Sequence, residues 1–179
     1  MDFLDYETSD LYFDDPMSAE DEALLHQAAN LYPSPETEKI LLDLHQRMAD
    51  NLTIIVALYR FYYYRHRYQD ALGIADKALD VAARQLDLRV EWPQLSEELL
   101  GHGVMVSMGL IRFYMLALKA AAYLYMRIGE IEKAHARLKK IVSLDPADQF
   151  GAGFLFKMAE KELSIKLAQQ HDIESLFKR

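Results

Sequence analysis

The densest group of reactive side chains in the sequence is the run from Arg60 to Tyr68. It contains four basic residues, counting His66, and five aromatic residues. Such a mixture is typical of surfaces that stack on single-stranded nucleic acid. The run lies in a helical pattern, however, so its side chains point in several directions. The net charge of −8 also repels phosphate. We therefore do not expect this protein to bind nucleic acid.

The spacing of Glu132 and His135 could supply two ligands of a di-iron site in a helical bundle. Such a site needs a second copy of this motif, and the sequence has no second Glu-x-x-His, so we expect the pair on an exposed face. The six histidines lack metal-ligand spacing, and the absence of cysteine excludes thiolate ligands and nucleophiles. No P-loop, dinucleotide fingerprint or nucleophile elbow occurs. We expect no metal, no cofactor and no catalytic residue, and therefore no enzyme.

A helical hairpin over residues 103–146 is the element around which the rest of the chain is organised. Its first arm, 104–126, has apolar residues on nearly every side, so other helices should surround it. A glycine-containing turn leads to a second, amphipathic arm, 131–144. The first arm is long enough to span a bilayer. Because Arg112 and Lys119 would both lie within the hydrocarbon, we interpret it as a buried helix and expect no membrane contact.

The other segments also show helical patterns, and the 7 glycines and 5 prolines leave long stretches without either residue. The fold class is therefore all-α. Asn51 is the one position at which the longest of these helices could be interrupted, and Gly101 and Gly103 predict a sharp turn before the central hairpin. The remaining predicted helices cover residues 18–31, 34–66, 68–85, 94–100 and 147–169.

Charge is distributed unevenly along the chain. Residues 1–38 contain 11 Asp or Glu and no Lys or Arg, whereas residues 39–179 contain 17 acidic and 20 basic residues. We divide the chain into an acidic, aromatic tail, residues 1–17, and a single helical domain, residues 18–179. The tail is expected to be flexible until it orders against a surface, unless it serves only solubility. Because a basic n-region is missing, we expect a cytoplasmic protein.

Two of the predicted hairpins resemble the tetratricopeptide repeat (TPR), a helix–turn–helix unit of 34 residues. The units cover about residues 52–85 and 115–146. In the first, the positions of the repeat motif are occupied by Leu58, Tyr62, Tyr68, Ala71, Ala75 and Ala78. In the second, they are occupied by Ala122, Tyr125, Gly129, Ala134, Leu138, Asp145 and Pro146.

The two units are degenerate. Tyr59 and Ile141 stand where the repeat has small residues, and Ala75 replaces an aromatic one. The resemblance implies antiparallel helical hairpins stacked as a right-handed α-α superhelix, with irregular flanking helices as caps. It also implies a concave groove lined by the first helix of each unit.

The resemblance places a partner-binding groove on specific residues. Its cations and aromatic rings would bind an acidic or C-terminal carboxylate group of a protein or peptide segment, and its methionines would adapt to apolar side chains. The aromatic residues of the tail match such a groove, so we expect the tail to bind there or on a partner. The tail residues are Phe3, Tyr6, Tyr12 and Phe13. The groove residues are Val56, Arg60, Tyr63, Tyr64, Met108, Arg112, Met115, Lys119, Tyr123, Met126 and Arg127.

Three functions compete at this point. The first is a non-enzymatic binding protein: an adaptor, chaperone or assembly and accessory factor for a larger protein complex. The second is a metal-binding protein or enzyme built in a helical bundle, which metal analysis of the purified protein would detect. The third is a structural subunit that forms homo-oligomers through the central helix, with a homodimer as the simplest form.

Overall fold

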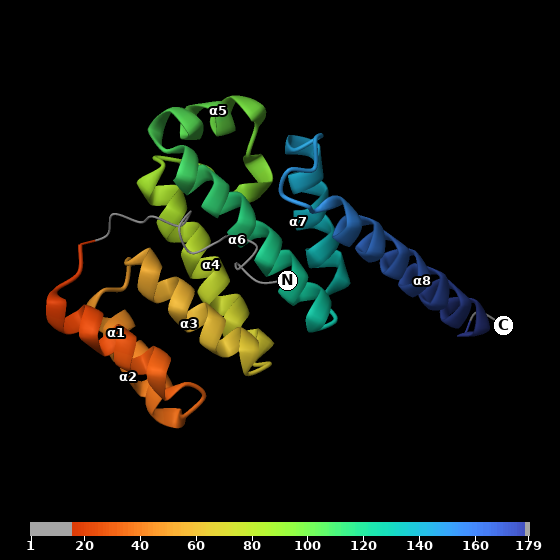
Figure 1. Cartoon of the computed structure of the whole chain (residues 1–179). Helices are drawn as coiled ribbons and strands as arrows, with labels where there is room; N and C mark the ends of the chain where they lie inside the picture. Colours follow the sequence, from red (N-terminus) through yellow and green to blue (C-terminus); the bar gives the residue numbers. More distant parts are fainter. Residues whose placement is uncertain (1–15, 178–179) are drawn as a thin grey trace.

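The computed structural model describes the backbone of residues 16–177 and the side chains of residues 16–170. Every regular element in this part of the chain is helical, which confirms the all-α fold class. The order of elements, shown in Figure 1, is α1 (Ala19–Leu31), α2 (Pro35–Arg47), α3 (Leu52–Tyr64), α4 (Tyr68–Gln85), the 3-10 turn η2 (Trp92–Gln94), α5 (Glu97–Val106), α6 (Met108–Arg127), α7 (Ile131–Leu144) and α8 (Gly153–Phe177).

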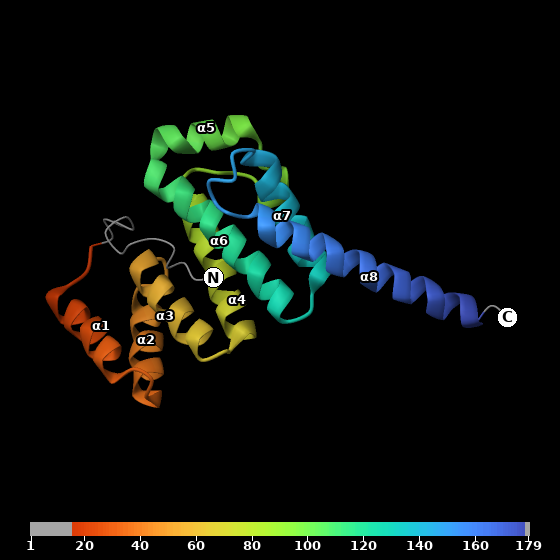
Figure 2. The ribbon, with the colours of Figure 1, turned by 45° about the vertical axis from the view of Figure 1, so that its right-hand side comes forward.

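The helices form a row in which sequence neighbours pack together. Short turns join α1 to α2, α3 to α4 and α6 to α7, and each of these pairs packs side by side. The pairs are linked by further contacts, α2 with α3 and α4 with α6, while α5 packs on α6. In the turn after α6, Gly129 has a φ of 81°, a conformation that favours glycine. Figure 2 shows α8 packed on α7 and extending away from the rest of the row.

Among the described helices, α6 contributes the largest number of buried residues, as its apolar sequence predicts. Twelve of its residues are buried, including Phe113 and Leu118, which are both 0% exposed. The contacts of α6 with α4 on one side and α7 on another account for this burial. Ala71 of α4 and Ala122 of α6 are also completely buried. A side chain larger than a methyl group would have little room at either position.

The predicted helix over residues 34–66 is wrong in its length. The structure ends α2 at Arg47 and begins α3 at Leu52, with Asn51 as the N-cap between them. The Asn51 side chain accepts a hydrogen bond of 3.1 Å from the amide of Ile54. Asparagine is among the preferred N-cap residues because this bond satisfies an amide at the helix start. The result is two antiparallel helices in place of one rod.

The predicted turn at Gly101 and Gly103 is also wrong, because both residues lie within α5. The chain breaks instead at Ser107, whose hydroxyl accepts a hydrogen bond of 3.2 Å from the amide of Leu110 and caps α6. Gly103 serves a close approach: a Cβ atom there would lie only 2.7 Å from Cδ1 of Ile111. A larger residue at position 103 would therefore require the Ile111 side chain to shift.

The last helix begins later than predicted, at Gly153 instead of 147. Two aspartates hold the preceding loop: Asp145 accepts a hydrogen bond of 2.8 Å from the amide of Phe150, and Asp148 accepts one of 2.9 Å from the amide of Gly153. The break at Ser107 also divides the bilayer-length run of the sequence. Within residues 16–177, no helix combines the length and the apolar character that a membrane crossing requires.

Candidate partner-binding site

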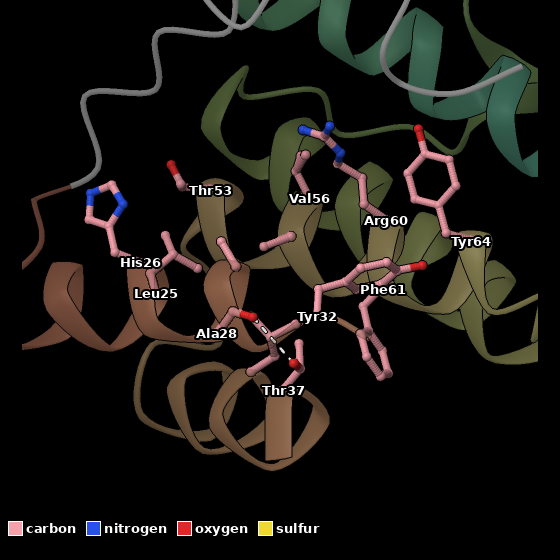
Figure 3. Close-up of a pocket in the computed structure, with 13 residues that line it drawn as sticks. Leu25, His26, Ala28, Tyr32, Thr37, Thr53, Val56, Arg60, Phe61 and Tyr64 are labelled. Carbon is pink, nitrogen blue, oxygen red and sulfur yellow. Dashed lines mark hydrogen bonds between the residues drawn. The ribbon is translucent and has the colours of Figure 1, made fainter. Parts of the chain in front are cut away.

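An open cavity of about 540 Å³ lies between α1, α2 and α3, and we name it the α1–α3 cavity (Figure 3). Its volume falls within the range of pockets that bind small ligands or single side chains. The lining is mostly apolar, with a few polar groups. The lining residues are Leu25, His26, Ala28, Ala29, Tyr32, Thr37, Leu41, Thr53, Val56, Ala57, Arg60, Phe61 and Tyr64.

The walls of this cavity are tied together by polar contacts between its helices. The Thr37 hydroxyl, which is buried, donates a hydrogen bond of 3.2 Å to the carbonyl of Ala28 and so joins α2 to α1. An ion pair of 2.6 Å between Arg47 and Asp21 joins the same two helices. On the other side, the rings of Tyr32 and Phe61 meet edge to face at 6.2 Å. These contacts indicate that the cavity is formed before any partner binds.

Polar side chains stand at the mouth of the α1–α3 cavity, while Val56 and Leu41 form part of its apolar interior. Figure 3 shows Arg60 and Tyr64 side by side at one edge and His26 at the opposite edge. Among the described residues, no carboxylate lies within ion-pair distance of Arg60. A desolvated carboxylate placed over this mouth would gain a charge-assisted hydrogen bond from the guanidinium.

A second cavity, of about 760 Å³, lies between α5, α6 and the loop before α8. Lys119 is only 5% exposed there, and its ammonium group donates a hydrogen bond of 2.6 Å to the carbonyl of Phe150. Arg112 and Met108 are exposed at this cavity, whereas Met115 is buried. The ammonium group of Lys119 therefore attaches the loop before α8 to α6 and provides a hydrogen bond for a backbone carbonyl.

A tyrosine cluster on α3, α4 and α6 consists of Tyr63, Tyr68, Tyr123 and Arg127, none of which lines either cavity. Arg127 lies 4.5 Å above the ring of Tyr68 and donates a hydrogen bond of 2.9 Å to the Tyr123 hydroxyl. The hydrogen bond from Arg127 to Tyr123 helps to raise the pKa of Arg127 further above its already high ordinary value. The ring of Tyr63 lies 6.3 Å from that of Tyr123, which joins α3 to α6. The contacts in this cluster therefore hold α3, α4 and α6 together.

The predicted groove residues therefore lie in three places. Val56, Arg60 and Tyr64 line the α1–α3 cavity. Met108, Arg112, Met115 and Lys119 line the second cavity, and Tyr63, Tyr123 and Arg127 form the tyrosine cluster. Met126 is half-buried against the core. The structure does not bring Arg60, Lys119 and Arg127 into one cavity, as a single groove would require.

Four predicted contacts, Phe3, Tyr6, Tyr12 and Phe13, lie outside the described residues. Conversely, the sequence analysis missed the contribution of α1 to the α1–α3 cavity, because the repeat resemblance does not extend to that helix. The signal that could have revealed it is the helical spacing of Leu25, Ala28, Ala29 and Tyr32, which all line the cavity. Only Ala28 among these is buried, so the row is left open on the cavity side.

The candidate metal ligands have other partners. Glu132 forms an ion pair of 2.7 Å with Lys166, and the His135 ring stacks on Phe156 with ring centres 5.2 Å apart. Glu132 is exposed, as predicted, and its pKa is lowered, chiefly by the hydrogen bond from Lys166. In the described part of the chain, no group of three or more His, Asp or Glu residues lies close enough to hold a metal ion.

The fold and its cavities define an all-α protein of packed helical hairpins that carries an open, largely apolar cavity at one end. The sequence is 39% identical over 155 residues to the "uncharacterized 19.8 kDa protein in nifW 5′ region" of Azotobacter chroococcum mcd 1. The match covers 87% of this chain and 86% of that relative. This chain belongs to the family of that protein. No family model and no solved structure matches it.

Proposed function

We propose that this protein is a non-enzymatic binding module that acts as an adaptor or accessory factor for a larger protein complex. One observation carries the proposal: the α1–α3 cavity is open, apolar inside, and has at its mouth a guanidinium that forms no ion pair with a described residue. Apolar interiors with a few orienting polar groups are typical of recognition sites. The partner chemistry that fits is an apolar side chain next to a carboxylate.

The packing of the hairpins supports a tetratricopeptide-like architecture for this module. The two repeat-like units, 52–85 and 115–146, correspond to the pairs α3/α4 and α6/α7. Alanines at the small-residue positions of the repeat, such as Ala78 and Ala134, are completely buried. Stacked hairpins with small residues at their contacts bind partner segments in several known repeat folds. The chaperone or accessory role proposed here depends on that architecture as well as on the cavity.

The gene position of the relative supports an accessory role that is connected with the nif genes. The name of that protein places its gene in the region 5′ of nifW. Neighbouring bacterial genes often serve one process, so we propose that this protein also works with products of a nif gene region. The nifW product is accordingly the first purified partner to test.

The experiment compares three tagged full-length proteins in cells that express the nif region: the wild type, Arg60→Glu and the control Arg89→Glu. Arg89 is an exposed cation outside both cavities, and its ion pair is with Asp87, two residues away. We expect the wild type and Arg89→Glu to capture the same protein and Arg60→Glu to lose it. Binding is then measured by calorimetry with that protein in purified form. Equal capture by all three variants would remove the α1–α3 cavity from the proposal.

A homo-oligomeric subunit is the second candidate function. The surface available for contact between copies is on α8 and not on α6. Most of α6 is buried within the chain, so little of it is available for pairing. On α8, four large apolar side chains are exposed: Phe154 (69%), Met158 (40%), Ile165 (48%) and Leu167 (55%). Light scattering decides between a monomer of 20.7 kDa and a multiple of this mass. Phe154→Ser with Met158→Ser should restore the monomer if α8 is the contact.

A further inference from the structure

We propose that the N-terminal segment of this chain, residues 1–15, binds in the α1–α3 cavity of the same molecule, with Leu11, Tyr12 and Phe13 as its apolar anchor. The inference rests on the proposed function, since it takes the cavity as a peptide-binding site and names its resident ligand. A partner protein would then have to displace this segment. Binding would be controlled by the chain itself.

The chemistry of the segment complements that of the cavity. Residues 1–15 contain six acidic residues, four aromatic residues and no Lys or Arg. The cavity offers an apolar interior, a guanidinium from Arg60 at its mouth and the imidazole of His26 opposite. Asp10 and Asp14 flank the Leu-Tyr-Phe triplet, so carboxylates would stand beside the mouth when the triplet is inside. The segment thus contains the apolar side chain next to a carboxylate that this site favours.

The N-terminal segment has only a short distance to cover to the α1–α3 cavity, because it directly precedes α1. Helix α1 is itself one wall of the cavity, and it begins at Ala19, just after the segment. His26 at the mouth lies seven residues further along α1, or about 10 Å at 1.5 Å per residue. The three residues between Phe13 and Met17 span about 10 Å when extended. The triplet can therefore fold back along α1 and reach the mouth without moving any helix.

Tethering also favours this occupant over a free peptide. A ligand joined to its site by a short linker has an effective concentration in the millimolar range. A segment of modest intrinsic affinity would therefore fill the cavity most of the time. A competing partner must bind more tightly than this, or must itself bind the released segment. The second cavity lacks this advantage, because it lies between α5, α6 and the loop before α8.

The absence of cysteine allows a direct test in the full-length protein. A nitroxide is attached at Ser9→Cys, next to the proposed anchor but outside it. Paramagnetic broadening is then measured on the methyl signals of Leu25, Leu41 and Val56, which line the cavity. Val142 on α7 provides the control methyl group. We expect strong loss of intensity at the three cavity residues and little at Val142, with full recovery when the nitroxide is reduced.

Two variants make the test specific. Replacement of the anchor by Leu11→Ser, Tyr12→Ser and Phe13→Ser should abolish the broadening without touching any described residue. Arg60→Glu should weaken it, because the acids would then face a like charge, whereas Arg89→Glu should leave it unchanged. Broadening that is unaffected by the anchor substitutions would overturn the proposal.

Other outcomes would also overturn it. Signal loss at Met108 and Met115 in place of Val56 would locate the segment in the second cavity. Broadening on isotopically labelled chains that carry no nitroxide, after mixing with chains that do, would show that a second copy supplies the segment. The readout needs no partner protein. Absence of broadening together with Arg60-dependent partner capture would therefore reject this inference and leave the proposed function intact.

Discussion

Arg137 on α7 donates a hydrogen bond of 2.8 Å to Asp76 on α4, across 61 residues of sequence. The guanidinium also lies 4.8 Å from the centre of the Tyr125 ring and 5.4 Å from that of Trp92. Only 10% of the Arg137 side chain is exposed. One side chain therefore connects α7, α4, α6 and η2, and a buried cation is satisfied by charge and by aromatic faces together.

We expect Arg137→Ala to lower the free energy of unfolding by about 1–3 kcal/mol, because it removes a charge-assisted hydrogen bond and the contacts of the guanidinium with two aromatic rings. Urea denaturation of the full-length protein gives this value. The matched control is Arg89→Ala, whose ion pair with Asp87 is exposed and should contribute less than about 1 kcal/mol. Equal midpoints for the two variants would show that the Arg137 contacts do not stabilise the fold.

Larger side chains at the close helix contacts should be costly. Ala71→Leu and Ala122→Leu each place three extra carbons where the native side chain is completely buried, so each should destabilise the protein by roughly 1–3 kcal/mol. Ala23→Leu on the exposed face of α1 is the control. Thermal or chemical denaturation provides the measurement. Unchanged midpoints at positions 71 and 122 would argue against tight packing of the repeat-like hairpins.

Stability should fall at alkaline pH in part because of the buried side chain of Tyr114. Burial raises the pKa of Tyr114 to about 12 from its ordinary value of 10.0. The unfolded chain releases this proton near pH 10 and the folded chain does not, so the contribution is complete below pH 10 and is lost as the pH rises towards 12. The maximum loss is about 2–3 kcal/mol. In denaturation series at pH 9 to 12, Tyr114→Phe should flatten this decline, and an unchanged decline in this variant would contradict the prediction.

Replacing the anchor of the N-terminal segment should strengthen partner binding. If residues 1–15 occupy the α1–α3 cavity, the Leu11→Ser, Tyr12→Ser and Phe13→Ser variant binds the captured partner without a displacement step. Calorimetry should then give a lower Kd than for the wild type. Amide exchange across residues 1–17 should show protection in the wild type alone and less protection in the variant. Weaker partner binding by the variant would indicate that the segment contacts the partner.

Local chemistry was the part of the fold that the sequence could predict. The Ser18 side chain caps α1 by accepting a hydrogen bond of 3.1 Å from the amide of Asp21, as its position before a run of acids indicates. The apolar circumference of α6 likewise predicted its burial. The sequence indicates the break at Asn51 only as an option, because asparagine prefers N-caps but also occurs inside helices, and tertiary packing decides between the two positions.

The site was harder to predict because its contacts are distant in sequence. The ammonium of Lys119 donates a hydrogen bond to the carbonyl of Phe150, 31 positions away. The position of Lys119 in its helical pattern does not predict a contact with the loop that contains Phe150. Arg127 was expected in a groove, yet its nearest ring belongs to Tyr68 on another hairpin. A repeat pattern predicts which face of a helix each residue lies on. It does not predict the contact partner of a cation, because that partner depends on how neighbouring hairpins are displaced relative to each other.

Helix α8 packs mainly against α7, at the opposite end of the row from α1. In such a one-dimensional array, each element is stabilised by its nearest neighbours, and a disturbance fades within one or two of them. Fraying of α8 should therefore leave the α1–α3 cavity intact. Ligand binding at the α1–α3 end and the packing of α8 at the other end should therefore vary independently of each other.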